Sequence, residues 1–255
     1  MSTDAHAEIR TEVTDRVAVL TLSNPSRRNA LNLDLSRKLV DAVHAAESDQ
    51  GVGAIVVTGE APAFCAGGDL AELAEADHAV LREVYSGFLA VANSPLPTLA
   101  AVNGAAVGAG LNLALACDVR LAGPTARFDT RFAQLGLHPG GGYTWMVQRA
   151  LGAQGAAAMT LFCDVLDAAE AERVGLVWRR YESDEALLAG ALELAGRAAA
   201  ADRGLITTTK STLRVTADLT HAQATEVEVR AQAVTVNSDD FRERLTALRS
   251  KISTR

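Results

Sequence analysis

Two stretches of the chain have the composition of loops that could bind an oxyanion through the backbone. They are VVTGEAPAFCAGGDL (56–70) and AAVNGAAVGAGLNLALACD (100–118), and each predicts a buried strand, a tight loop of small residues and a helix start. N–H groups at such loops and at helix N-termini lack backbone partners and attract negative charge. Two of them directed at one oxygen form an oxyanion hole, in which small residues leave room for a ligand carbonyl. The alternative is that glycine and alanine only allow close packing of helix on strand.

A dinucleotide site is a second chemical interpretation of Gly104, Gly108 and Gly110. The loop lies after at least two earlier strand–helix units, however, and no acid follows about 20 residues later to bind a ribose. Neither Tyr143 nor Tyr181 is followed four residues later by the Lys of short-chain dehydrogenases. These observations disfavour a dinucleotide-binding dehydrogenase.

The composition excludes several classes of protein. The chain has 255 residues, enough for one large α/β domain or two small ones, and a formal net charge of −7 that disfavours nucleic-acid binding. Basic residues do gather at 26–29 and 241–255, where they could bind one anionic small molecule. The three cysteines show no CxxC spacing, which predicts reduced thiols and no metal site. With a polar N-terminus that lacks a signal sequence, this composition predicts a cytoplasmic location.

The longest uncharged run, residues 84–117, raises the question of a membrane span. A spanning helix needs about 20 consecutive apolar residues. This run is interrupted by Pro95, Pro97, Gly104, Gly108 and Gly110, which divide it into elements too short to span. The sequence therefore predicts buried protein and no membrane association.

The elements that must position the two loops follow from periodicity. Alternating residues predict a hairpin around Asp15 and Arg16, and three- and four-residue steps predict a helix over 32–48. Strands are expected at 53–59, 98–102 and 118–123, with helices at 71–92 and from about 109 to 116. This order predicts an α/β fold with a mostly parallel, doubly wound or spiral sheet. Past Gly142 a strand is expected only at 176–180, and the rest is predicted to be helical.

Five segments together resemble the enoyl-CoA hydratase/isomerase (crotonase) superfamily. They are NPSRRNALN (24–32), AFCAGGDL (63–70), PTLAAVNGAAVGAGLNLALACDVRLA (97–122), LGLHPGGGYTWMVQRALG (135–152) and AERVGLV (171–177). The resemblance implies a crotonase-like spiral of β-β-α turns over 1–195 and a helical C-terminal region over 196–255. It further implies a homotrimer or a dimer of trimers, and an acyl thioester of coenzyme A as ligand, with no other cofactor.

The resemblance also assigns backbone and side-chain roles. It implies an oxyanion hole made by the N–H groups of Gly68 and Ala109, which would stabilise a thioester enolate. It places the following residues around coenzyme A or the acyl group: Arg27, Arg28, Ala30, Ala66, Asp69, Leu70, Gly108, Tyr143, Phe241 and Lys251. Alternatives remain for several of these. The arginines could be solvated, Asp69 could cap a helix, Tyr143 and Phe241 could pack in a core, and Lys251 could be solvated.

The chain departs from the family at both catalytic glutamates. The hydratases of the family use one glutamate to deprotonate water and another to supply a proton to the α-carbon. These positions are held here by Asn112 and Phe132. An amide can orient water but cannot accept a proton at neutral pH, and a phenyl ring can do neither. Standard two-glutamate hydration is therefore not expected.

Two nearby residues are candidate substitutes for the missing glutamates. Asp129 lies three residues before Phe132, and His138 lies in LGLHPGG, where an imidazole could act as acid or base. Alternatively, Asp129 pairs with Arg127 or Arg131 or caps a short helix near Thr130, and His138 bonds its own loop.

Three functions remain open. The first is a hydratase or isomerase of fatty acid metabolism that uses a non-standard base. The second is another enolate reaction, such as decarboxylation, thioester hydrolysis or C–C cleavage. The third is a non-catalytic acyl-CoA-binding protein that kept the fold and the oxyanion hole.

Overall fold

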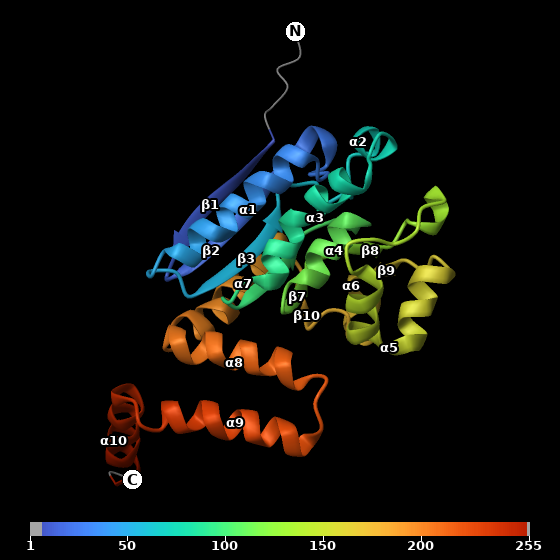
Figure 1. Cartoon of the computed structure of the whole chain (residues 1–255). Coiled ribbons are helices and arrows are strands. Elements are labelled where there is room, and N and C mark those ends of the chain that lie inside the picture. The colour runs from blue at the N-terminus through green and yellow to red at the C-terminus, as the bar shows by residue number, and fades with distance from the viewer. Residues whose placement is uncertain (1–6, 254–255) are drawn as a thin grey trace. The chain divides into compact units, whose positions relative to one another are not determined.

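The computed structural model describes residues 7–253 (Figure 1). The chain divides into two compact units, with the boundary in the sequence between Ala199 and Ala200. Each unit is described by itself. The polar segment 1–6, expected to lack a signal sequence, lies outside the described residues. No helix in the described part of the chain is long and apolar enough to cross a membrane.

A six-stranded sheet forms the base of the first unit. Its order is β1-β2-β3-β5-β7-β10, with β1 at Glu8–Thr14, β2 at Val17–Ser23, β3 at Ala54–Gly59, β5 at Thr98–Val102, β7 at Val119–Ala122 and β10 at Arg179–Arg180. Only β1 and β2 are antiparallel, and Asp15 and Arg16 turn between them with φ of 48° and 66°. Two successive positive φ values suit the twist of a tight hairpin, so the predicted hairpin is confirmed.

A second sheet of very short strands carries the loops of interest. Its order is β4-β6-β8-β9, from β4 at Ala63–Cys65, β6 at Ala105–Val107, β8 at Arg127–Asp129 and β9 at Leu166–Asp167. The first three strands are parallel and β9 is antiparallel to β8. The sequence analysis missed this sheet, and its expectation that strands past Gly142 are confined to 176–180 is wrong at β9. Strands of two or three residues are too short to show a period of two.

The chain winds as a spiral in which each turn contributes one strand to each sheet and then a helix. The turns run β3-β4-α2-α3, β5-β6-α4 and β7-β8-α5, with a 3-10 helix η2 at Ala133–Leu135 before α5. These helices are α2 at Leu70–Ala74, α3 at His78–Asn93, α4 at Ala109–Ala116 and α5 at Tyr143–Leu161. The predicted α/β spiral of β-β-α turns is confirmed.

Two helix predictions differ in detail from the structure. The helix expected over 71–92 is two helices, because the Asp77 side chain accepts hydrogen bonds from the N–H groups of Ala79 and Val80 and starts α3 anew. Inside α5, Gly152 has a φ of 68° and breaks the helical path. By contrast, α1 at Leu33–Ser48 starts where the periodicity places it, capped by Asn32.

Helices cover both faces of the large sheet. α1, α3 and α4 pack on one face around Phe64, Phe88 and Phe128, while α7 at Asp184–Ala199 covers the other. Burial on both faces explains why β3 and β5 are continuous apolar runs. α6, at Ala168–Arg173, leads from β9 toward β10. The core thus fixes the ends of the parallel strands, where the loops begin.

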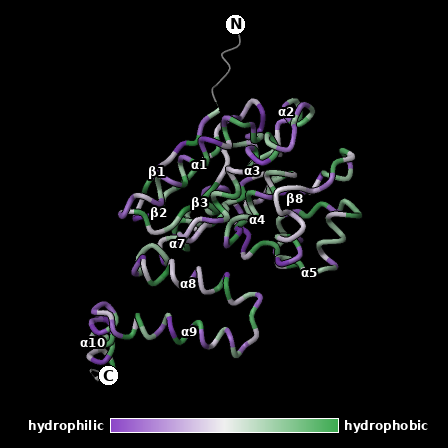
Figure 2. The backbone as a smooth tube through the Cα atoms, viewed as in Figure 1, coloured by the Kyte–Doolittle hydropathy of each residue, from purple (hydrophilic) through white to green (hydrophobic). Residues whose placement is uncertain are grey.

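The second unit consists of α8 at Arg203–Thr216, α9 at His221–Thr235 and α10 at Asp239–Ser253. Asp202 caps α8, and Thr220 with Gln223 forms a capping box at α9. Polar and apolar residues alternate closely along α9 (Figure 2), which has no buried residue. The helical character predicted for this region is confirmed.

Candidate functional site

In the first loop, an isolated parallel β-bridge between Leu31 and Gly68 sets the direction of the Gly68 N–H. Leu31 N–H donates to the Gly67 oxygen at 2.8 Å, and Asp69 N–H donates to the Leu31 oxygen at 2.8 Å. Successive N–H groups of an extended segment point to opposite sides, so the N–H of Gly68 faces away from Leu31. Within residues 7–253 this N–H has no hydrogen-bond partner.

The second loop presents the Ala109 N–H at the start of α4. Gly108 is the N-cap, with a φ of 50°, and its own N–H donates to the Asp129 oxygen at 2.9 Å. No side chain caps the helix, and the first N–H groups of a helix have no intrahelical acceptor. In the described part of the chain the Ala109 N–H is therefore also unpaired.

The two loops are in direct contact. β4 and β6 pair in parallel at Cys65 and Ala106, and Gly68 and Ala109 each lie three residues beyond that pair. A Cβ on Gly110 would lie 2.0 Å from the Cys65 oxygen, so the first turn of α4 rests on the end of β4. Close backbone approach thus brings the two unpaired N–H groups to one end of the small sheet.

Asn29 anchors the segment that holds the first loop. It has a φ of 59° and is fully buried. Its Nδ2 donates to the backbone carbonyl oxygens of Glu60 and Ala63 at 2.7 and 2.8 Å, and its Oδ1 accepts from the Asn24 backbone N–H at 2.8 Å. The side chain thereby ties the segment that leads to Leu31 to the segment between β3 and β4.

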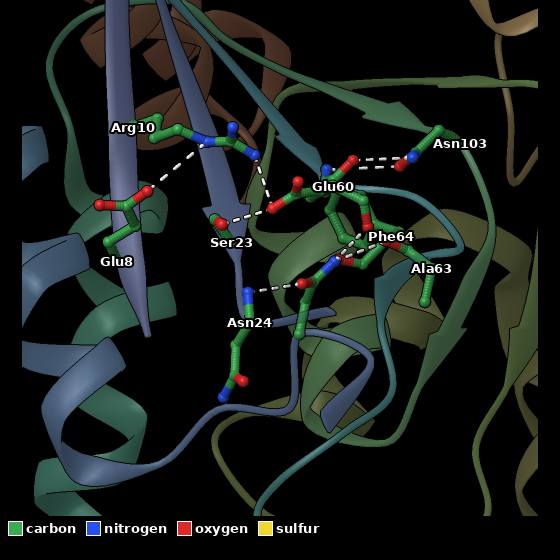
Figure 3. A network of polar contacts seen from close by, with 10 residues as sticks. Glu8, Arg10, Ser23, Asn24, Glu60, Ala63, Phe64 and Asn103 are labelled. Carbon is green, nitrogen blue, oxygen red and sulfur yellow. Dashed lines mark hydrogen bonds and ion pairs between the residues drawn. The ribbon is translucent and has the colours of Figure 1, made fainter. Parts of the chain in front are cut away.

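A half-buried carboxylate completes this network. Glu60 accepts a hydrogen bond from the Ser23 hydroxyl and forms an ion pair with Arg10, whose Nη2 lies 2.6 Å from Glu60 Oε2 (Figure 3). The Ser23 bond, together with Arg10 and against the effect of desolvation, lowers the pKa of Glu60. Asn103 fixes the neighbouring loop by donating to the Gly59 oxygen at 2.7 Å.

Both loops open on a cavity of about 630 Å³. Gly68 and Ala109 are in its wall, with Asn112, Phe132 and Tyr85. The basic side chains of the wall are those of Arg28, Arg131 and His138, and no Asp or Glu lines this cavity among the described residues. The cavity can therefore accept a mainly apolar ligand with an anionic or carbonyl oxygen, and the described part of its wall offers no carboxylate base.

Asn112 lies in the wall, and only the nitrogen of its side-chain amide has a hydrogen-bond partner among the described residues. Its Nδ2 donates to the Gly140 oxygen at 2.9 Å, and the side chain is only 2% exposed. Its Oδ1 is the one buried side-chain polar atom without a hydrogen-bond partner among the residues that the structure describes. The amide thus carries an unused acceptor and no ionisable group.

Phe132 makes the adjoining wall apolar. It is 9% exposed and packs against Tyr143, with ring centroids 5.4 Å apart. Tyr143 is fully buried and lies outside the cavity wall, where its hydroxyl accepts a hydrogen bond from Thr160. Burial raises the pKa of Tyr143. The structure therefore places Tyr143 in the core behind Phe132, away from any ligand in this cavity.

Asp129 is directed at Arg131 rather than at the cavity. Its carboxylate pairs with the Arg131 guanidinium and accepts from the Arg131 N–H at 2.9 Å. Arg131 has a φ of 55°, and the hydrogen bond and charge of Asp129 raise its pKa. Arg131 lines the cavity and Asp129 does not. Asp129 thus holds a strained residue in place and has its charge neutralised.

His138 is the remaining candidate, and it does line the cavity. Its Nδ1 lies 2.7 Å from the Pro139 oxygen. A carbonyl oxygen only accepts, so Nδ1 carries the proton and Nε2 of the neutral ring is left with a free lone pair. Of the two candidate substitutes, the structure brings only His138 to the cavity.

The residues expected around coenzyme A are partly brought together. Arg28, Ala66, Leu70 and Gly108 line the cavity, and Ala30 does not. Arg27 pairs with Asp69, with Nη1 and Oδ2 3.6 Å apart, and Asp69 also caps α2. Phe241 belongs to the second unit, and the side chain of Lys251 lies outside the described side chains.

Several wall residues were missed by the sequence analysis, and Tyr85 is the one among them with an ionisable side chain that no expected role covered. Tyr85 reaches the cavity from α3, and burial raises the pKa of its phenol. Its position follows from the packing of α3 on α1 and α4. The spacing of apolar residues over 71–92 does not indicate which side chain of the helix faces a cavity. An aromatic side chain within an amphipathic helix is ordinarily part of the core, as the neighbouring Phe88 is.

Comparisons with known proteins give the family and agree with the fold of this chain. A sequence model of the enoyl-CoA hydratase/isomerase family matches residues 12–253. The "Probable enoyl-CoA hydratase EchA14" of Mycobacterium tuberculosis is 50% identical over 246 residues, covering 92% of this chain and 94% of that protein. The 2,3-dehydroadipyl-CoA hydratase of Escherichia coli is 43% identical over 188 residues, 72% of each chain. The crystal structure of an enoyl-CoA hydratase from Polaromonas sp. JS666 superposes with a TM-score of 0.89 at 30% identity, covering 96% of this chain and 97% of that one. With this family match, sequence relatives and fold in agreement, the chain belongs to the enoyl-CoA hydratase/isomerase family.

Proposed function

We propose that the chain binds an acyl-CoA or enoyl-CoA thioester, with the thioester oxygen held by the N–H groups of Gly68 and Ala109. The observation that carries this proposal is the pair of unpaired N–H groups on two touching loops at one cavity. Two donors on one oxygen stabilise the negative charge of a thioester enolate. On the same proposal, Arg28 and Arg27 lie toward the phosphates of coenzyme A.

The reaction we propose is hydration or isomerisation of an enoyl thioester with His138 in place of a glutamate base. Asn112 orients the water or the acyl group and Phe132 excludes water from the opposite wall. His138 is favoured over Asp129 because it lines the cavity and its Nε2 is free, whereas the Asp129 carboxylate is paired with Arg131. One imidazole would then move the proton that two carboxylates move in the family.

A non-catalytic acyl-CoA-binding protein is the second candidate. It is favoured by a specific observation, the lack of any carboxylate in the described cavity wall. Such a protein would keep the fold and the two N–H donors, and it would release its ligand unchanged. Whichever holds, we propose a homotrimer or dimer of trimers built by the helices after Ala200.

The test is the loss of conjugated-enoyl absorbance when the purified protein meets short- and medium-chain trans-2-enoyl-CoA between pH 6 and 9. Turnover that rises with pH as an imidazole loses its proton supports the hydratase, and His138→Gln should abolish that limb. A matched control is His44→Gln, since His44 lies on the exposed side of α1. Binding of the thioester without turnover would favour the non-catalytic candidate, and absence of binding would refute the proposal.

A further inference from the structure

The side chain of Glu72 ties α2, the short helix that follows Gly68, to the start of α1. Glu72 Oε2 accepts a hydrogen bond from the Leu33 backbone N–H at 2.9 Å. Leu33 is the first residue of α1, so its N–H has no acceptor within its own helix. A carboxylate at this positive end of a helix forms a charge-assisted hydrogen bond, which is stronger than a neutral one. Within residues 7–253 the Glu72 carboxylate makes no other hydrogen bond and no ion pair.

Few other features hold α2 in place. The helix has five residues, none of them buried, and a helix of that length is not stable by itself. Leu70 and Leu73 are three residues apart, so they share one face of α2, and both line the cavity. Glu72 is not in the cavity wall. α2 therefore has an apolar face toward the cavity and a carboxylate that attaches it to α1.

The position of α2 bears directly on Gly68. A Cβ on Gly68 would lie 2.9 Å from Leu73 Cδ1, so the Leu73 side chain packs against this glycine. The hydrogen bond from Asp69 N–H to the Leu31 oxygen and the one from Leu33 N–H to Glu72 join the same two segments, 31–33 and 69–72. Two attachments fix the orientation of one segment on the other, whereas a single attachment leaves it free to rotate.

We propose that Glu72 is a positioning residue for the oxyanion hole. By holding α2 on α1 it keeps Leu73 against Gly68 and the Gly68 N–H directed at the thioester oxygen, without itself touching the ligand. This inference rests on the proposed function, because it takes Gly68 to be a donor to that oxygen. Loss of Glu72 should weaken the interaction with the thioester carbonyl and leave the contacts with the rest of the ligand unchanged.

The test compares two ligands that differ only at the carbonyl: butyryl-CoA and the thioether S-butyl-CoA, in which a methylene replaces the carbonyl. The ratio of their dissociation constants, measured by calorimetry, reports the contribution of the carbonyl oxygen. Two hydrogen bonds to this oxygen are expected to make butyryl-CoA bind about tenfold more tightly to the wild type. Glu72→Ala should lower the ratio to about threefold or less, through weaker binding of butyryl-CoA. Glu72→Gln should keep most of the ratio, because its amide oxygen can still accept from the Leu33 N–H.

Glu172→Ala is the matched control. Glu172 lies in another short helix, α6, and its carboxylate also accepts from a backbone N–H, that of Arg180 at 3.0 Å, but neither residue lines the cavity. This variant should leave the ratio unchanged. An unchanged ratio in Glu72→Ala, or an equal loss of affinity for both ligands, would overturn the positioning role alone. If the wild type binds neither ligand, or binds both equally, the proposed function fails and this inference with it.

Discussion

Gly110 lies so close to Cys65 that a Cβ on the glycine would be 2.0 Å from the Cys65 carbonyl oxygen. The contact is between the backbone of Gly110 in α4 and the backbone of Cys65 in β4, and both elements are well packed. Neither backbone can move aside as the end of a flexible side chain could. The contact sets the separation of the loops that carry Gly68 and Ala109. The geometry of the candidate oxyanion hole is thus fixed by packing outside the cavity wall.

Gly110→Ala should therefore both destabilise the fold and weaken thioester binding. Forcing a methyl group into a packed contact costs about 1–3 kcal/mol of unfolding free energy. Urea unfolding and calorimetry with butyryl-CoA measure the two effects. Gly196→Ala, in α7, is the control, because its Cβ would meet nothing within 4 Å. Unchanged stability and binding in Gly110→Ala would show that the loops are not held by this contact.

The sequence predicted the elements whose residues repeat over a sufficient length. The hairpin around Asp15, the helix that follows Asn32 and the buried strand ending at Gly59 each show a period or an uninterrupted apolar run. The strand ending at Cys65 could not be predicted in this way, because three residues show no period. It forms because parallel pairing with β6 satisfies its backbone.

The residues of the candidate site likewise differ in whether local sequence or the folded chain determines their position. The prediction of Gly68 and Ala109 as donors rests on local composition and resemblance, since small residues before a helix are visible in the sequence. The direction of the Gly68 N–H depends on Leu31, which is 37 residues earlier and bridges it only in the folded chain. Similarly, the choice between Asp129 and His138 depends on which of them the fold turns toward the cavity.

Ala109→Pro tests the second N–H donor directly. Ala109 is the first residue of α4, where proline is tolerated, so the change removes the N–H with little effect on the helix. Loss of one oxyanion-hole donor lowers kcat by about 10²–10³-fold. His78→Pro is the control, because His78 is the first residue of α3 and is exposed. Enoyl-CoA turnover measures the effect, or thioester affinity if the protein only binds, and equal loss in both variants would contradict the assignment.

Asp129→Asn should reduce stability and leave the pH dependence of turnover unchanged. The carboxylate holds Arg131 at a positive φ and accepts hydrogen bonds from both the backbone N–H and the guanidinium of Arg131. Hydrogen bonds to a charged group contribute about 1.5–3 kcal/mol, so a loss of about that size in unfolding free energy is expected. Thermal unfolding and a pH–rate profile separate the two effects. Disappearance in Asp129→Asn of the limb that rises with pH, with that limb retained in His138→Gln, would assign the base to Asp129 instead.

Glu60→Gln should remove part of the loss of stability that occurs in acid. The folded-state pKa of Glu60 lies below its ordinary value, chiefly because Ser23 donates a hydrogen bond to the carboxylate, with Arg10 contributing. Because the folded state binds the proton less readily than the unfolded chain, this contribution is fully present above the ordinary pKa of glutamate, about 4.3. It is lost as the pH falls through the lower folded-state pKa.

Melting temperatures measured from pH 7 down to pH 3 should therefore fall less steeply for Glu60→Gln than for the wild type. Glu243→Gln is the control, because Glu243 is exposed on α10. Parallel curves for Glu60→Gln and the wild type would show that the Ser23 and Arg10 contacts do not lower the pKa of Glu60 in solution.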